Sequence, residues 1–174
     1  MNITPTLDNV SRRFKRRPSG HAAEITVHIL RELAVGKSVC DQPHLVVEYW
    51  RSHIATHPTF DAMKEHLVVL ALNTRRKIMA HNLVALVALD TVLAHPREVF
   101  RPLVAVAAAA FILCHNHPSG DPTPSEGDIK VTRDLIRAGQ MMKIELLDHV
   151  VLGDPTPERP KDYSSLRELG YFYA

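Results

Sequence analysis

The sequence predicts an α/β sandwich in which helices flank a central mixed β-sheet, and three observations support this class. Apolar runs of strand length alternate with segments of helical periodicity, in the order strand, strand, helix, strand, helix, strand. A short polar turn joins the first two strands, which indicates a hairpin. The length of 174 residues suits one domain with enough material to bury a core.

Two segments precede the predicted sheet. Residues 1–20 are polar, basic and without periodicity, which predicts a disordered arm. Residues 21–58 are predicted to form a helical extension, with one helix around residues 22–33 and a second from Pro43 to about Ile54. Residues 59–174 are then expected to form the main domain.

The first strands and the helix after them follow from composition. Residues 65–73 are continuously apolar enough to be a strand buried on both faces. Residues 73–76 predict a turn, and residues 77 to about 86 the partner strand. Pro96 opens a helix that is expected to run through the alanine-rich residues 105–110.

The second half of the chain predicts a strand, a helix and a further strand. Residues 111–114 form a short apolar run, and the turn-rich residues 118–124 cannot continue a strand. A helix begins near Ser125, and residues 144–152 form another strand that ends at Gly153. The helix has a predicted packing face at three- and four-residue spacing, made of Ile129, Thr132, Leu135, Ile136 and Gly139.

Two histidines at the end of the short apolar strand predict a metal site. His115 and His117 are two residues apart, so both imidazoles project from one side of an extended backbone and can meet one metal. The turn that follows can bring Asp128, in the first helical turn, beside them. Two imidazoles and one carboxylate leave the fourth position open for water, which is typical of catalytic zinc. We expect one Zn²⁺ per chain, although iron or manganese also suits this donor set.

A simpler interpretation applies to part of this pattern. Ser125 and Asp128 also fit a helix-capping arrangement, in which the serine oxygen accepts a backbone N–H and the acid favours the positive helix end. Capping explains these two residues without any metal. It does not explain why an apolar strand ends in two histidines that flank a single residue.

The other histidines and the cysteines have structural interpretations. Cys40 and Cys114 are far apart, which argues against a disulfide framework or a thiolate cluster, and Cys114 is expected in the core. His53 and His57 are predicted to face solvent at the end of a helix. His149 lies inside a predicted strand, where we expect a core residue or a support for the metal ligands.

Charge and hydropathy limit the partners. The longest apolar stretches are shorter than the roughly 18 to 20 residues that span a membrane, and no secretory signal pattern opens the chain. We therefore expect a soluble, cytoplasmic protein without membrane contact. Residues 1–17 hold one acid and five basic side chains, a balance of +4 against about −2 for the rest. The basic residues of this arm, which can contact phosphates of DNA weakly, are Arg12, Arg13, Lys15, Arg16 and Arg17.

The motifs of this chain resemble those of a known family. His115-x-His117, seven further residues and Ser125-x-x-Asp128, with Glu65 at the start of an earlier strand, resemble the JAMM signature of MPN/JAB-domain metalloproteases. Within that superfamily the RadC-like branch is more similar still. The segments that resemble its motifs in order are 96–100, 115–120, 147–151 and 163–166, and the resemblance covers about residue 24 to the end.

The resemblance implies a fold and a division of roles. The fold is that of MPN/JAB domains, which are related to cytidine deaminases, with one zinc at the edge of a mixed sheet. His115, His117 and Asp128 would hold the zinc. Glu65 would accept a proton from the attacking water, and Ser125 would donate a hydrogen bond to the developing oxyanion. The implied reaction is hydrolysis of an amide bond in a peptide or protein tail.

The chain also departs from the family pattern. Val87-Ala88 stands where RadC-like proteins usually have Gly-Thr, which affects a segment expected near the substrate groove. The helix-hairpin-helix region that commonly precedes this domain does not fit in residues 1–40. An alternative function, suggested by the traditional label of the RadC-like branch and by the basic arm, is a non-catalytic accessory module in DNA repair or recombination that binds DNA through this arm. A cytidine deaminase is excluded, because His-x-Glu and Pro-Cys-x-x-Cys are both missing.

Overall fold

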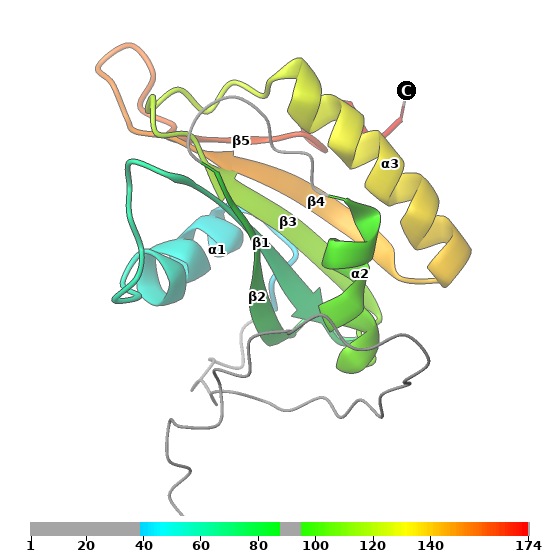
Figure 1. The fold of residues 1–174 in the computed structure, drawn as a ribbon. Coiled ribbons are helices and arrows are strands. Elements are labelled where there is room, and N and C mark those ends of the chain that lie inside the picture. Colours follow the sequence, from blue (N-terminus) through cyan, green and yellow to red (C-terminus); the bar gives the residue numbers. More distant parts are fainter. Residues whose placement is uncertain (1–38, 88–94, 174) are drawn as a thin grey trace, which may run out of the picture. The chain divides into compact units, whose positions relative to one another are not determined.

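The computed structural model of the chain describes residues 39–87 and 95–173 (Figure 1). The predicted arm of residues 1–20 and the helix predicted at residues 22–33 lie outside these ranges, as does Ala88. DNA contact through the arm and the effect of the replacement at Ala88 therefore stay predictions.

Five strands form one sheet in the spatial order β2-β1-β3-β4-β5 (Figure 1). They are β1 (Glu65–Leu72), β2 (Ile78–Val87), β3 (Ala110–Asn116), β4 (Glu145–Leu152) and β5 (Tyr163–Ser165). β1 runs antiparallel to both β2 and β3, β3 runs parallel to β4, and β4 runs antiparallel to β5. The sheet is mixed, which confirms the predicted fold class.

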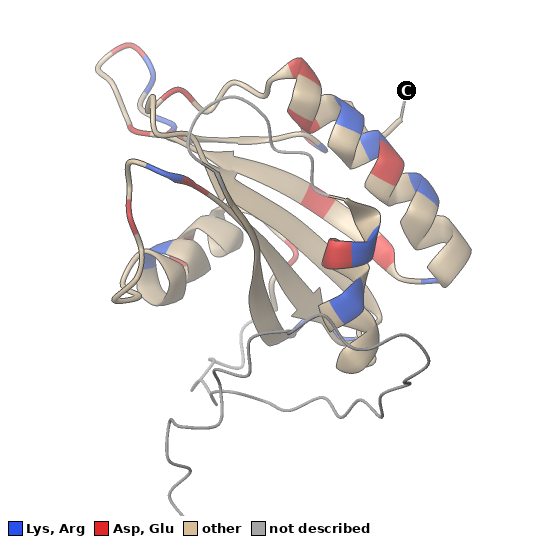
Figure 2. Ribbon diagram, viewed as in Figure 1, with Lys and Arg blue, Asp and Glu red and all other residues tan. Residues whose placement is uncertain are grey.

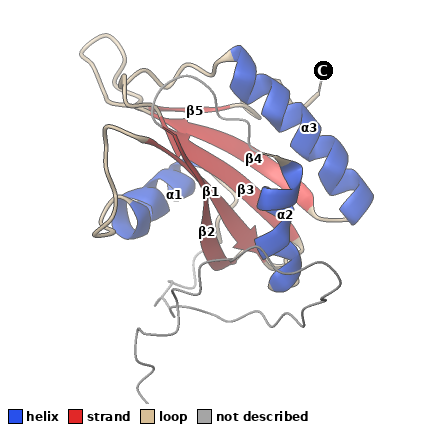
Figure 3. Ribbon diagram, in the orientation of Figure 1, coloured by secondary structure: helices blue, strands red, loops and turns tan. Residues whose placement is uncertain are grey.

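Helices cover both faces of this sheet. They are α1 (Pro43–Tyr49), the π-helical turn η2 (Trp50–Ile54) that continues it, α2 (Pro96–Ala105) and α3 (Glu126–Met142). Figure 3 shows α1 on one side of the sheet and α2 and α3 on the other. The helix predicted from Pro43 to Ile54 is confirmed, and its last part has the wider π geometry.

β1 supplies side chains to the hydrophobic cores on both faces of the sheet. Successive side chains of a strand point to opposite faces. Leu67 and Val69 pack in the core that contains residues of α2 and α3, whereas Val68 and Leu70 pack in the core that contains residues of α1. Every residue of β1 after Glu65 is buried, which explains why the strand is apolar without alternation.

The β1–β2 hairpin is closed by a polar turn, as predicted. The side-chain oxygen of Asn73 accepts hydrogen bonds from the backbone N–H groups of Arg75 and Lys77, at 2.9 and 3.1 Å. Arg76 adopts a left-handed conformation with φ of 58°. Asparagine is common at the first position of such a turn, because its short side chain can accept hydrogen bonds from the backbone N–H groups that follow.

The predicted helix through residues 105–110 is wrong at its C-terminal end. α2 ends at Ala105, and Ala107 has a left-handed φ of 53°. The backbone N–H of Ala109 donates to the carbonyl of Leu72 at 2.9 Å, and Ala110 already pairs with that residue in the sheet. The helix propensity of alanine is worth less here than the backbone pairing that starts β3.

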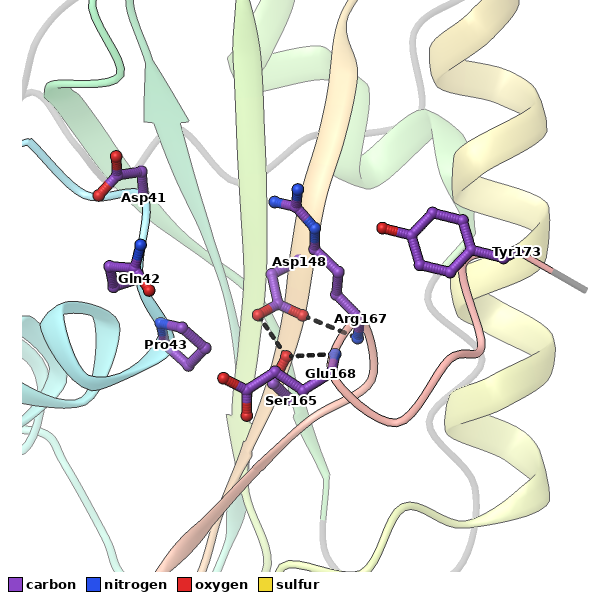
Figure 4. Close-up of a pocket in the computed structure, with 8 residues that line it drawn as sticks. All are labelled: Asp41, Gln42, Pro43, Asp148, Ser165, Arg167, Glu168 and Tyr173. Atoms are coloured by element: carbon purple, nitrogen blue, oxygen red, sulfur yellow. Dashed lines mark hydrogen bonds between the residues drawn. The ribbon is translucent and has the colours of Figure 1, made fainter.

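The C-terminal segment is anchored to β4 through a buried carboxylate, and its short strand β5 was not predicted. Asp148 accepts hydrogen bonds from the Ser165 hydroxyl at 2.6 Å and from the Arg167 backbone N–H at 3.2 Å, beside a pocket that the same residues line (Figure 4). Burial raises the pKa of the Asp148 carboxyl. Three residues are too few for a strand pattern to be visible in the sequence.

Charged side chains of both signs are interspersed on α3 (Figure 2). They belong to Glu126, Asp128, Lys130, Arg133, Asp134 and Arg137. Such mixing gives this helix no strongly basic face. Within residues 39–87 and 95–173, the helices all fall short of the length and apolar character required to cross a membrane.

Candidate metal centre

Four potential metal ligands meet at one end of the sheet. Glu65 begins β1, His115 and His117 lie at the end of β3, and Asp128 lies in the first turn of α3. Each of them offers a ligand atom, and these atoms all lie within 4.8 Å of one another. His115 is fully buried, Asp128 is 8% exposed, and Glu65 and His117 are partly buried. The structure thus brings the three predicted metal ligands and the predicted general base together.

The strand register explains why Glu65 reaches the histidines. β1 and β3 are antiparallel and Leu67 pairs with His115, so the first residues of β1 lie beside the last residues of β3. Glu65 and Leu67 share a face of the strand, because they are two residues apart. This face is the one covered by α3, whose first turn carries Asp128.

The distances between the ligand atoms suit a small tetrahedral ion. Nε2 of His115 lies 3.0 Å from Nε2 of His117 and 3.2 Å from Oδ1 of Asp128. Nε2 of His117 lies 3.6 Å from Oδ2 of Asp128. Donors that are each bound at 2.0 to 2.2 Å to a tetrahedral zinc are separated by about 3.3 to 3.6 Å. Imidazole nitrogens and a carboxylate oxygen are also the donor types that zinc prefers.

The imidazole of His117 is oriented by a backbone carbonyl. Its Nδ1 lies 2.7 Å from the carbonyl oxygen of Asp121. Because a carbonyl can only accept a hydrogen bond, Nδ1 is the atom that donates. In the neutral ring Nε2 therefore keeps its lone pair, and this atom faces His115. Nε2 of His115 lies 3.0 Å from this lone pair, so a proton on one of the two nitrogens or a cation between them is needed to make the contact favourable.

The loop that supplies this carbonyl is held by Arg159. Its guanidinium donates to Oδ1 of Asp121 at 2.7 Å and to the carbonyl oxygen of Gly120 at 2.9 Å. It also donates to the carbonyl oxygen of Asp154 at 2.8 Å. Gly120 has a φ of 78°, which a residue with a side chain rarely adopts. Arg159 thus connects the C-terminal part of the chain to the orientation of His117.

The titrating groups show that the centre favours positive charge. Burial alone would raise the pKa of the Asp128 carboxyl, but contacts with the imidazoles of His115 and His117 hold it far below its ordinary value. Burial pushes the pKa of His117 down, yet its interactions with Asp128 and with the Asp121 carbonyl leave it above the ordinary value. Both shifts have the sign expected where a cation or an extra proton is bound between these groups.

Glu65 is the one carboxylate of the group with a raised pKa. Burial raises the pKa of Glu65, and the nearby His115 opposes this shift. Oε1 of Glu65 lies 3.6 Å from Nε2 of His115. A carboxylate with a raised pKa takes up a proton more readily than an exposed one.

Ser125 and Asp128 form the predicted capping box, and the same contacts serve the centre. The Ser125 hydroxyl donates to Oδ2 of Asp128 at 2.6 Å, the Ser125 backbone N–H donates to the same oxygen at 2.8 Å, and the Asp128 N–H donates to the hydroxyl oxygen at 3.2 Å. These bonds leave Oδ1 directed at His115. Capping and ligand placement are therefore not alternatives here. The Ser125 hydroxyl is itself used within the capping box.

Sequence reasoning missed Asn116 as a supporting residue. Its Oδ1 accepts from the backbone N–H of His66 at 2.9 Å, and its Nδ2 donates to the carbonyl oxygen of Lys64 at 3.0 Å. These two bonds lie on either side of Glu65 and continue the pairing of β1 with β3 beyond the last backbone contacts. An amide between the two histidines was the available signal.

His149 occupies the buried position that was expected for a core or supporting histidine. It is 1% exposed, and its Nε2 lies 2.9 Å from Nδ1 of His115. Burial holds the pKa of His149 well below its ordinary value.

The other two histidines considered in the sequence lie away from the centre. His53 is stacked on Tyr49, and His57 is exposed. Neither belongs to the group of potential ligands.

The mixed sheet, the helices on both faces and the histidine–carboxylate centre define a domain of the JAB/MPN type. The chain belongs to the RadC-like JAB domain family, whose profile matches residues 40–171. It is 48% identical over 108 residues to the UPF0758 protein YsxA of Bacillus subtilis, and this match covers 62% of the chain and 44% of that relative.

Two other relatives are also UPF0758 proteins and match a similar share of the chain. A UPF0758 protein of Moorella thermoacetica is 50% identical over 91 residues, which are 52% of this chain and 40% of the relative. A UPF0758 protein of Desulforamulus reducens is 45% identical over 110 residues, which are 63% of this chain and 46% of the relative. The matched region thus spans less than half the length of these curated relatives.

Proposed function

We propose that this chain is a zinc-dependent metallopeptidase or isopeptidase that hydrolyses an amide bond in a peptide or protein tail. The observation that carries the proposal is the pair of Nε2 atoms 3.0 Å apart, with the Asp128 carboxylate beside them and the partly buried Glu65 on the neighbouring strand. His115, His117 and Asp128 would hold the ion. A bound zinc ion would supply Lewis acidity and bring the pKa of a water molecule to about 7.

Glu65 would act as the general base and then as the general acid. Its carboxylate takes a proton from the attacking water and delivers it to the leaving amine. Its raised pKa favours the first transfer at neutral pH. Its side chain is 20% exposed, against 0% for His115 and 10% for Asp128, which leaves it accessible to a substrate.

Ser125 would stabilise the developing oxyanion. To do so its hydroxyl has to turn away from Oδ2 of Asp128, to which it donates in the structure. The Ser125 backbone N–H would still hold that oxygen at 2.8 Å. The helix cap therefore keeps one of its bonds while the hydroxyl serves the substrate.

The proposal is tested by metal content and by one substitution. We expect elemental mass spectrometry to find about one zinc per chain in the wild type and none in His115→Ala. Glu65→Gln should keep the zinc and lose hydrolysis of a peptide or protein-tail substrate by roughly 10²- to 10⁴-fold.

The matched control is Glu126→Gln, the same change at an exposed glutamate of the first α3 turn that lies outside the group of ligands. It should retain both zinc and activity. A Glu65→Gln enzyme that hydrolyses substrate as fast as the wild type would rule out the mechanism. A wild-type protein without metal would rule out the site itself.

A further inference from the structure

A buried chain of hydrogen bonds connects the first turn of α3 to His115. The Thr132 hydroxyl donates to the carbonyl oxygen of Asp128 at 2.6 Å and lies 2.7 Å from Nδ1 of His149. Nε2 of His149 in turn lies 2.9 Å from Nδ1 of His115. Thr132 and His115 are fully buried and His149 is 1% exposed, so bulk water does not compete for these bonds.

The direction of every bond in this chain follows from its first member. A carbonyl oxygen can only accept, so the single hydroxyl hydrogen of Thr132 is used on Asp128. The Thr132 oxygen is then only an acceptor for His149, and Nδ1 of His149 must carry a proton.

The second ring nitrogen of His149 fixes the position of the proton on His115. The two ring nitrogens of His149 face a hydroxyl and another imidazole, neither of which is an anion that would stabilise a charged ring at a buried position. A neutral His149 with its proton on Nδ1 has only a lone pair on Nε2. Nδ1 of His115 therefore donates to it, and Nε2 of His115 is left without a proton, facing Asp128 and His117.

We propose that Thr132 and His149 are positioning residues that fix the tautomer of His115 so that its Nε2 is always available to a cation. The inference deepens the proposed function and rests on the metal site described there. It also connects two proposed ligands, because the carbonyl that starts the chain belongs to Asp128. Groups behind a metal-binding imidazole commonly change metal affinity by 10- to 100-fold.

The test is Thr132→Val, with Thr132→Ser as its matched control. Valine fills the same space and lacks the hydroxyl, so His149 is no longer required to carry its proton on Nδ1. It can then donate from Nε2 to His115, which moves the His115 proton onto Nε2. We expect zinc affinity, measured by competition with a chelator, to fall about 10- to 100-fold in Thr132→Val and to return nearly to the wild-type value in Thr132→Ser.

A second measurement separates this inference from the proposed function. Nitrogen-15 NMR of histidine-labelled, metal-free protein at slightly alkaline pH reports which nitrogen of each ring is protonated. Wild type and Thr132→Ser should carry the His115 proton on Nδ1, and Thr132→Val should shift it toward Nε2. This result supports the inference even if the wild type binds no zinc, which would count against the proposed function alone.

Two outcomes would overturn the inference. One is a wild-type protein in which Nε2 of His115 is protonated, a result that needs no variant to fold. The other is a folded Thr132→Val protein, judged by its thermal unfolding, with unchanged zinc affinity and an unchanged His115 tautomer.

Discussion

Asn116 fixes the start of the strand that carries Glu65. Its amide bonds to His66 and Lys64 take the place of the backbone pairing that β3 no longer provides at its end. Glu65 pairs with Val87 of β2 on its other side, but toward β3 its position depends on the bonds that Asn116 makes to His66 and Lys64. A general base has to stand within hydrogen-bond reach of the proton it removes, and a small displacement is enough to slow the reaction.

We therefore expect Asn116→Ala to lower kcat by roughly 10-fold or more while zinc content stays that of the wild type. The two lost hydrogen bonds should also cost about 1 kcal/mol each in the free energy of unfolding. Hydrolysis rates and elemental mass spectrometry on the same preparation test both parts. Asn82→Ala, the same change at an exposed position of β2, is the control and should leave both quantities unchanged. Loss of zinc in Asn116→Ala would mean that the amide supports the ligands rather than the base.

The residues of the centre differ in how far the sequence reveals them. His115, His117 and Asp128 are close together in the sequence, and local geometry is enough to predict that they meet. Asn116 and Thr132 act on partners that are brought to them only by the sheet and by the docking of α3. Their roles depend on contacts such as Thr132 with His149, which no local pattern contains.

At the scale of elements, α3 is fixed at both ends. Ser125 caps its N-terminus, and Lys143 with a φ of 57° ends it in the left-handed region. Gly139 packs directly against the backbone that follows, because a Cβ at this position would lie 2.5 Å from the carbonyl oxygen of Ile144. The backbone just before β4 therefore packs directly against the C-terminal turns of α3.

Substitution of the two glycines of α3 should have opposite effects. Gly139→Ala should destabilise the protein by about 1 to 3 kcal/mol, because the backbone of Ile144 has to move. Gly127→Ala should stabilise it by up to about 1 kcal/mol, since alanine favours the helix and the nearest atom to its Cβ would be the Ser125 oxygen at 3.5 Å. Urea unfolding of both variants measures the difference. Equal stability of the two variants would show that the contact at Gly139 is relieved without cost.

Element type could be predicted from the sequence more fully than element ends. β1 is continuously apolar because it is buried along its length, and α3 has apolar residues at three- and four-residue spacing because one of its faces is buried along its length. α2 ends early because Ala110 pairs with Leu72, a contact between distant parts of the chain. β5 exists because Ser165 pairs with Val150 and bonds to Asp148, and no pattern within its three residues encodes that.

At the scale of the whole molecule, the core under α1 contains groups that resist ionisation. Cys40 and Cys114 are buried free thiols, and Tyr49 is buried beside them. Burial raises the pKa of Cys40 from 9.0 to about 12 and that of Tyr49 from 10.0 to about 12. Burial also raises the pKa of Cys114 well above its ordinary value. All three stay protonated in the folded state at a pH where the unfolded chain has released these protons.

Stability should consequently decrease as pH rises above 9, toward the folded-state value of about 12 for Cys40. In this range the unfolded state binds fewer protons than the folded state, so the free energy of unfolding decreases with pH. Each group contributes up to about 1.4 kcal/mol per pH unit. Urea unfolding at a series of alkaline pH values should show this slope, and Cys40→Ala should make it shallower. A slope that is unchanged in Cys40→Ala would show that the thiol does not remain protonated on folding.

The hydrogen bonds of Arg159 to the loop next to His117 affect what a fragment of this protein can retain. All four residues of the centre precede residue 129, so a piece of chain that ends soon after α3 would carry the entire signature. It would lack the guanidinium that holds Asp121 and Gly120, and with it the support for the carbonyl that orients His117. It would also lack His149. The support of the centre therefore extends beyond its recognisable motif, and we expect a fragment that keeps every signature residue to orient His117 less firmly than the full domain does.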